Sequence, residues 1–167
     1  MAEEFERITA EQRRLIESAP MFFVASTHLE LEPGPTGQGA VNVSPKGGVP
    51  LHVIDDRQVA YLDYTGSGNE TARHADAGGP VTVMVMSMDG EDAAIVRLYG
   101  HASVTPLGES PLAERLQQQP AESIELPERQ VVVVEVESTA TSCGYGVPVL
   151  EFRQQRTRAE RGRRFKA

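Results

Sequence analysis

The segment PVTVMVMSMDGEDAAIVRLYGHASVT, residues 80–105, carries the clearest sign of the architecture. Residues 80–88 form a strongly apolar run, and residues 93–105 form a longer one in which Gly100 predicts a bend. The Asp-Gly-Glu-Asp between them suits a tight turn. Such short connections favour antiparallel strands, because a parallel pair needs a long crossover.

The rest of the chain repeats this pattern of short β-like runs separated by turn residues. Thr9 and Gln12 fit a capping box at the start of the first of three short helices. The helices are too few and too short for a Rossmann crossover at every strand, so we expect a mainly β, antiparallel barrel of six or seven strands. The other expected strands cover residues 21–27, 40–44, 51–55, 58–64 and 129–142, the expected helices cover residues 8–20, 70–79 and 110–120, and residues 45–48 are expected to form a turn.

The length and charge of the chain predict one domain with a basic end. The 167 residues suit a single domain, which we assign to residues 1–152. Residues 153–167 hold seven of the 16 Lys and Arg residues but only one acid, whereas the net charge of the chain is −8. The acidic body disfavours broad nucleic-acid contact. The tail is expected to be a solvated or disordered end, with contact to RNA or anionic lipid as the alternative.

Targeting features point to the cytoplasm. No apolar run is long enough to span a membrane, and the acidic N-terminal region lacks the apolar core of a secretory signal. The single cysteine, Cys143, cannot form an internal disulfide and suits a reducing compartment. Without a neighbouring histidine, it is expected to be a small buried side chain rather than a nucleophile. The four histidines show no metal-ligand spacing, so no metal site is expected.

The turn GSGNET, residues 66–71, is a candidate anion site. It follows a predicted strand and opens a predicted helix, where free backbone N–H groups favour phosphate. Ser67, Asn69 and Thr71 add neutral donors, and Arg73 can add charge. The alternative is ordinary helix capping by Asn69 or Ser67, and the local pattern alone leaves both open.

The segment NVSPKGG, residues 42–48, is a second candidate. Lys46 lies between Pro45 and Gly47 at the end of a predicted strand, which fixes its position. Lysine is a common partner of phosphate or ring oxygens. The alternative is an exposed lysine in a turn.

Taken in order, several segments resemble the pyridoxamine 5'-phosphate oxidase-like family, the FMN-binding split β-barrels. The resemblance covers about residues 9–153 and is carried by FFVAST, VNVSPKG, YLDYTGSGNETARH, VTVMVMS, IVRLYGHASV and SCGYGVP. It implies a six-stranded antiparallel split barrel with a few short helices. It also implies a homodimer with two FMN molecules at the subunit interface.

The resemblance also implies roles for individual residues. Val43, Ser44 and Pro45 would lie near the flavin ring or ribityl chain, and Lys46 would reach the phosphate or a polar ring edge. Gly68 and Asn69 stand where relatives often carry Arg or Lys, so the turn is less cationic. The remaining implied cofactor contacts are Ser67, Asn69, Thr71 and Arg73 on the phosphate, and Tyr145, contributed by the partner subunit, over the ring.

The function implied is that of an FMN-dependent oxidoreductase acting on an unidentified small molecule. No catalytic side chain is assigned, since the cofactor performs the hydride chemistry. The chain has no histidine after His101, so it lacks the C-terminal Arg-x-His element of the vitamin oxidases. The alternatives are a non-catalytic flavin- or nucleotide-binding sensor or carrier, and a deazaflavin-dependent reductase.

Overall fold

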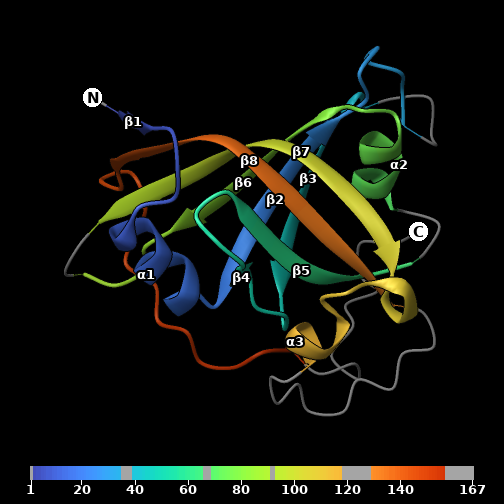
Figure 1. Ribbon diagram of the computed structural model, residues 1–167. Coiled ribbons are helices and arrows are strands. Elements are labelled where there is room, and N and C mark those ends of the chain that lie inside the picture. The colour runs from blue at the N-terminus through green and yellow to red at the C-terminus, as the bar shows by residue number, and fades with distance from the viewer. Residues whose placement is uncertain (1, 35–38, 66–68, 91–92, 118–128, 157–167) are drawn as a thin grey trace, which may run out of the picture.

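The protein is a single antiparallel sheet curled into a barrel that is not closed (Figure 1). The computed structural model describes residues 2–34, 39–65, 69–90, 93–117 and 129–156. The sheet order is β3-β2-β6-β7-β8-β5-β4, and β1 pairs with β8. The strands are β1 (Glu3–Phe5), β2 (Met21–Thr27), β3 (Val41–Gly47), β4 (His52–Val53), β5 (Gln58–Tyr64), β6 (Pro80–Met86), β7 (Ala94–Pro106) and β8 (Arg129–Cys143). The helices are α1 (Ala10–Ser18), α2 (Glu70–Asp76), α3 (Ala113–Gln117) and the 3-10 turn Leu107–Glu109.

The mainly β, antiparallel split-barrel prediction is confirmed. Six strands are at least seven residues long, and the described part of the chain adds two short ones, β1 and β4. The expected turn at residues 45–48 is wrong, because β3 continues through Pro45 and Lys46 to Gly47. Since β3 lies at one end of the sheet order, Pro45 removes no ladder hydrogen bond from a central strand.

The predicted bend at Gly100 appears as a register shift between Tyr99 and Gly100 in the pairing of β7 with β8. A Cβ atom built on Gly100 would lie 1.8 Å from the carbonyl oxygen of Glu135. Only glycine therefore allows the two backbones to approach this closely. The bend lets the long strand β7 follow the curve of the barrel and pair with both β6 and β8.

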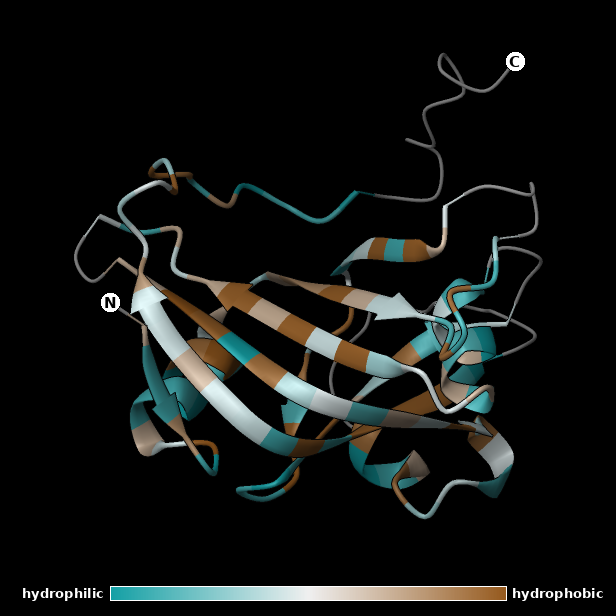
Figure 2. Cartoon of the chain, turned by 90° about the horizontal axis from the view of Figure 1, so that it is seen from above, coloured by the Kyte–Doolittle hydropathy of each residue, from teal (hydrophilic) through white to brown (hydrophobic). Residues whose placement is uncertain are grey.

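Alternation of side chains along the strands builds the barrel interior. Figure 2 shows brown and pale or teal bands alternating along several strands. The buried set is dominated by valine, which suits the pleated surface of a strand. Its fully buried members include Val24, Val83, Val85, Leu98 and Val134.

Helix α1 is attached to the barrel by a polar contact rather than by apolar packing alone. The Thr9–Gln12 capping box predicted from the sequence is present. The buried Gln12 side chain also donates to the Thr141 hydroxyl at 3.0 Å and accepts from the Thr139 hydroxyl at 3.0 Å. A residue of the capping box thus also joins the helix to β8.

Candidate functional site

The barrel is split where β3 faces the second half of β5 and the start of α2. The short strand β4 pairs only with Val59 and Ala60 of β5, so β5 beyond Tyr61 faces β3 through side chains. We call this opening the barrel seam. It is lined by Asn42, Ser44 and Lys46 of β3, Asp63 of β5 and Thr71 of α2.

An ion pair joins the two sides of the barrel seam. The Lys46 ammonium lies 2.6 Å from Oδ2 of Asp63, and the two side chains are 16% and 11% exposed. The other carboxylate oxygen, Oδ1, accepts the backbone N–H of Tyr64 at 2.9 Å. The ammonium also lies 5.8 Å from the centre of the Tyr61 ring. Lys46 is therefore held in one place, beside a carboxylate.

The Tyr61 hydroxyl lies in the interior beside this pair. Burial raises the pKa of Tyr61 far above its ordinary value, and the nearby Asp63 raises it further. Among the described residues, this hydroxyl is the buried side-chain polar atom without a hydrogen-bond partner. A neutral phenol next to the ion pair is thus available to donate a hydrogen bond.

Asn42 connects the three elements that meet at the seam. Its amide nitrogen donates to the Ser26 hydroxyl of β2 at 3.3 Å and to the Thr71 hydroxyl of α2 at 3.2 Å. Its amide oxygen accepts from the Ser44 hydroxyl at 3.2 Å. One side chain on the edge strand thereby sets the position of α2 against β3.

His74 completes this network from the buried side of α2. Its Nδ1 lies 3.0 Å from the Ser26 hydroxyl, and its Nε2 lies 3.7 Å from a carboxylate oxygen of Glu70. Burial lowers the pKa of His74, while Glu70 opposes that shift. The close packing of α2 depends on Gly79, where a Cβ atom would lie 1.8 Å from the carbonyl oxygen of Thr27. Gly78, with φ of +71°, ends the helix just before it.

The structure separates the predicted β3 residues onto two faces. Ser44 and Lys46 line the barrel seam with Asn42. Val43 and Pro45 alternate with them and are exposed on the other face of the strand; Val43 is 63% exposed. A single chain therefore does not present all four side chains to the same point.

The predicted phosphate turn is only partly described. Ser67 lies outside the described residues, while Thr71 is buried and bonded to Asn42. Asn69 precedes α2 without a side-chain capping hydrogen bond, so the capping alternative is wrong for Asn69. The Arg73 guanidinium forms an ion pair with the Glu70 carboxylate at 3.3 Å. With seven residues, α2 contributes only a short row of peptide dipoles.

Tyr145 and Cys143 lie outside the barrel seam: Cys143 is the last residue of β8, and Tyr145 is in the loop that follows it. Tyr145 is 94% exposed, as a residue directed toward another molecule would be. The expectation that Cys143 is buried is wrong, because its side chain is exposed. The cause is its place at the end of β8, where the chain leaves the sheet.

Sequence reasoning missed Asn42, Asp63, Ser26 and His74 as parts of one site. Asn42 and Asp63 do carry a signal, since each is a polar residue between two apolar or aromatic neighbours in its strand. Ser26 and His74 are 48 residues apart, and no local pattern predicts their contact.

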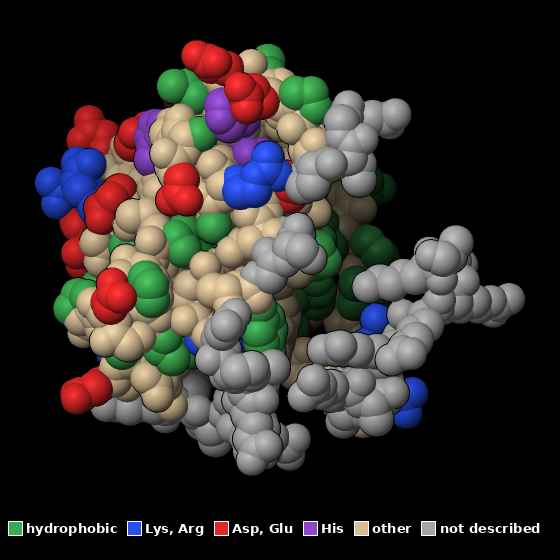
Figure 3. Space-filling view, turned by 90° about the vertical axis from the view of Figure 1, so that its right-hand side faces the viewer, with side chains coloured by type: hydrophobic (Ala, Val, Ile, Leu, Met, Phe, Trp, Pro, Cys, Tyr) green, Lys and Arg blue, Asp and Glu red, His purple; other side chains and the backbone are tan. Residues whose placement is uncertain are grey.

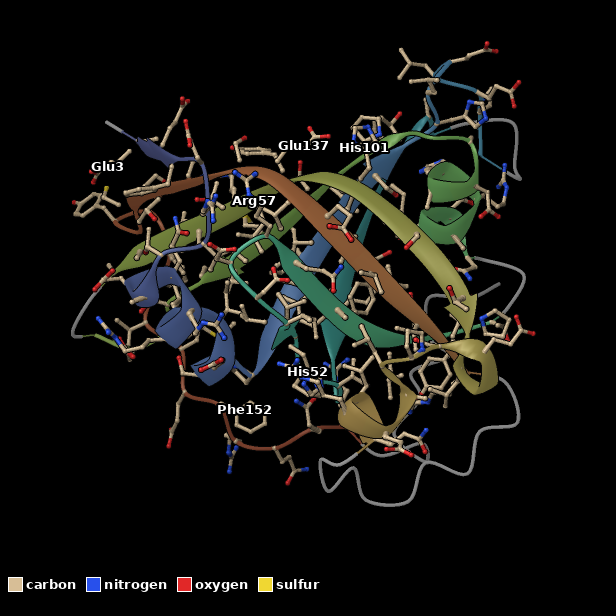
Figure 4. All side chains as sticks on the ribbon, viewed as in Figure 1. Glu3, His52, Arg57, His101, Glu137 and Phe152 are labelled. Carbon is tan, nitrogen blue, oxygen red and sulfur yellow. The ribbon has the colours of Figure 1, made fainter. Side chains whose placement is uncertain are left out.

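Other kinds of site find no support among the described side chains. No group of three or more His, Cys, Asp or Glu residues there is arranged to hold a metal ion. His101 lies outside the seam and pairs with Glu137 on the neighbouring strand at 2.8 Å (Figure 4). No helix in the described ranges is long and apolar enough to cross a bilayer.

Comparison with known proteins agrees with the fold. The family model described as pyridoxamine 5'-phosphate oxidase matches residues 8–143. The Aspergillus flavus pyridoxamine 5'-phosphate oxidase family protein ustO is 35% identical over 136 residues, which are 80% of this chain and 51% of that protein. The chain thus spans about half the length of this curated relative.

Two solved structures share the architecture at low sequence identity. HupZ of Group A Streptococcus is 22% identical with a TM-score of 0.57, covering 78% of this chain and 90% of that one. A Clostridium acetobutylicum protein related to general stress protein 26 of B. subtilis is 15% identical with a TM-score of 0.56, covering 80% and 86%. These two likenesses support the fold alone. The family match covers most of the chain, and the chain therefore belongs to the pyridoxamine 5'-phosphate oxidase family.

Proposed function

We propose that this protein is a flavin-dependent oxidoreductase that binds FMN at the barrel seam and acts on a small molecule. The observation that carries the proposal is the meeting of β3 with β5 and α2, joined by Lys46–Asp63 and Asn42–Thr71. Two segments that sequence reasoning linked to a cofactor thus line one opening. Polar groups that converge from several elements are typical of a cofactor site.

The side chains at the seam suit a flavin. The hydroxyl of Ser44 and the amide of Asn42 can bond the ribityl chain, and Lys46 has N–H donors beyond the one given to Asp63. Ser67, Asn69, Thr71 and Arg73 are proposed to hold the phosphate. When bound, FMN supplies the hydride chemistry. The role of this chain is to orient the flavin and to exclude water from it.

We also propose a homodimer with the flavin between the subunits. The outer face of β3 exposes Val41 and Val43, and the segment after β8 exposes Tyr145, Val149 and Phe152. Gln155 donates to the Pro20 carbonyl and lies beside Gly47. The segment that follows β8 therefore returns to the end of β3. Figure 3 shows hydrophobic side chains gathered in a hollow on the side where α2 lies. Apolar surface of this kind favours association with a second copy.

Flavin titration tests the proposed function. Purified protein is expected to be yellow or to quench the fluorescence of added FMN. Lys46→Ala is expected to lower FMN affinity by about tenfold or more, because it removes a charge-assisted contact and leaves Asp63 unpaired beside the phosphate. Gln58→Ala, on the barrel exterior, is the control and keeps the wild-type affinity. Unchanged affinity in Lys46→Ala would place the phosphate elsewhere.

The dimer has a separate test. Light scattering of the wild type is expected to give twice the mass of one chain. Val41→Glu places a charge on the outer face of β3, outside the proposed flavin contacts, and is expected to give monomers with weaker FMN binding. A wild-type monomer that binds FMN tightly would contradict the interface.

The second candidate is a non-catalytic flavin carrier or sensor, or a deazaflavin-dependent reductase. This candidate is favoured because Lys46 and Arg73, the two cationic side chains proposed as cofactor contacts, are both paired with carboxylates. Mass spectrometry of the co-purified ligand separates FMN from a deazaflavin. Tight FMN binding without oxidation of reduced nicotinamide cofactors or amines would support the carrier.

A further inference from the structure

The proposed phosphate site has balanced charges among its described residues. Lys46 is paired with Asp63 at 2.6 Å, and Arg73 is paired with Glu70 at 3.3 Å. The other described seam side chains, Asn42, Ser44 and Thr71, are neutral. An arriving phosphate dianion therefore meets two cations that already have counter-ions. This differs from a site built on unpaired lysine or arginine side chains.

Asp63 is fixed in place more firmly than a surface counter-ion. Its two oxygens have different partners, the Tyr64 N–H and the Lys46 ammonium, and the side chain is mostly buried. It cannot turn aside without losing both contacts. Its negative charge therefore persists when a ligand binds, and partial burial strengthens its field relative to water.

We propose that Asp63 is a specificity-determining residue, which reduces the preference of the barrel seam for flavins that carry a terminal phosphate. The inference rests on the proposed flavin site. Near neutral pH a phosphate monoester carries close to two negative charges. Lys46 attracts that group and Asp63, directly beside Lys46, repels it. The flavin ring and ribityl chain carry no such charge, so their binding is nearly unaffected by the pair.

The test compares riboflavin with FMN, which differ only in the phosphate. Affinities are measured by fluorescence quenching on the full chain after removal of any bound flavin. Asp63→Asn is expected to raise the preference for FMN over riboflavin by about fivefold or more, because it frees one charge-assisted contact. The Lys46→Met/Asp63→Asn double variant is expected to lose this gain, since the freed cation is then absent.

Asp56→Asn is the matched control. Asp56 also pairs with a basic side chain, Arg7, at 2.8 Å, so the substitution removes the same charge and an ion pair. It precedes Arg57 at the other end of β5, away from the barrel seam (Figure 4). The ratio of the two affinities is expected to stay at the wild-type value.

A salt titration of the wild type tests the inference even if Asp63→Asn folds poorly. Between about 20 and 300 mM NaCl, screening should change the FMN-to-riboflavin preference by less than about twofold, because the local charges balance. A tenfold fall would mean that Lys46 acts as a free cation and would overturn the inference. An unchanged preference in folded Asp63→Asn would do the same while leaving the flavin site intact. Failure of every form to bind either flavin would overturn the proposed function as well.

Discussion

Two buried polar clusters attach helices to this barrel, and they differ in what they face. Around α1, Gln12 bonds Thr9, Thr139 and Thr141 with neutral groups only. Around α2, Asn42, Ser26, Thr71 and His74 form a network beside Glu70 and the Lys46–Asp63 pair. The first cluster joins a helix to the long strand β8, whereas the second lies where the barrel is split.

The difference separates a structural polar cluster from one suited to binding. Neutral hydrogen bonds stabilise a fixed contact without large desolvation of charge. Charged groups retained at an opening cost more to desolvate and so favour a functional explanation. Substitutions at the α1 cluster should therefore change stability alone, and those at the α2 cluster should also change ligand binding.

The largest expected effect is on stability, in Gln12→Ala. This substitution removes three side-chain hydrogen bonds, one of which is half of the capping box. We expect a loss of about 2–4 kcal/mol in the free energy of unfolding, or about 5–12 °C in Tm. Thermal denaturation measures it, and flavin affinity should not change. Glu17→Ala, on the exposed face of the same helix, is the control and should cost under about 0.5 kcal/mol. Loss of flavin binding in Gln12→Ala would remove the distinction between the clusters.

Asn42→Ala is expected to have a smaller effect on stability and a clear effect on binding. It breaks the contact that holds α2 against β3 and the hydrogen bond that orients the Ser44 hydroxyl. We expect a loss of about 1–3 kcal/mol in stability and an FMN affinity several-fold weaker. Denaturation and fluorescence titration measure the two. A variant with reduced stability and full affinity would show that the network only supports the fold.

The pH dependence of stability sharpens the same comparison. The lowered pKa of His74 means that the folded protein binds this proton less readily than the unfolded chain does. Its contribution to stability is complete above about pH 6.5 and is lost as the pH falls through the lowered folded pKa. His74→Asn should flatten the fall of Tm below that pH. Equal slopes in wild type and His74→Asn would contradict this.

The smallest expected effect is that of Cys143→Ser. The thiol is exposed at the end of β8 and lies outside both clusters. Stability should change by less than about 0.5 kcal/mol, and flavin affinity should stay the same. Loss of turnover in this variant would give the thiol a chemical role.

Part of the site could be predicted from sequence because its signals are local. Lys46 and Thr71 stand out beside turn residues, and the strand β5 between them follows from its residue pattern. The partners that determine their chemistry are distant in sequence: Asp63 is 17 residues from Lys46, and Thr71 is 29 residues from Asn42. No periodicity encodes such contacts, because they depend on how the sheet curls.

The antiparallel strands, the capping box at Thr9 and the bend at Gly100 could be predicted from the sequence, since each depends on neighbouring residues and backbone sterics. The folded arrangement was needed to show that Lys46 is neutralised by Asp63 and that Asn42 joins β3 to α2. It also shows that Val43 and Pro45 are exposed on the outer face. The physical reason is that curling the sheet brings its edge strand next to β5, and charge compensation depends on distance in space rather than along the chain.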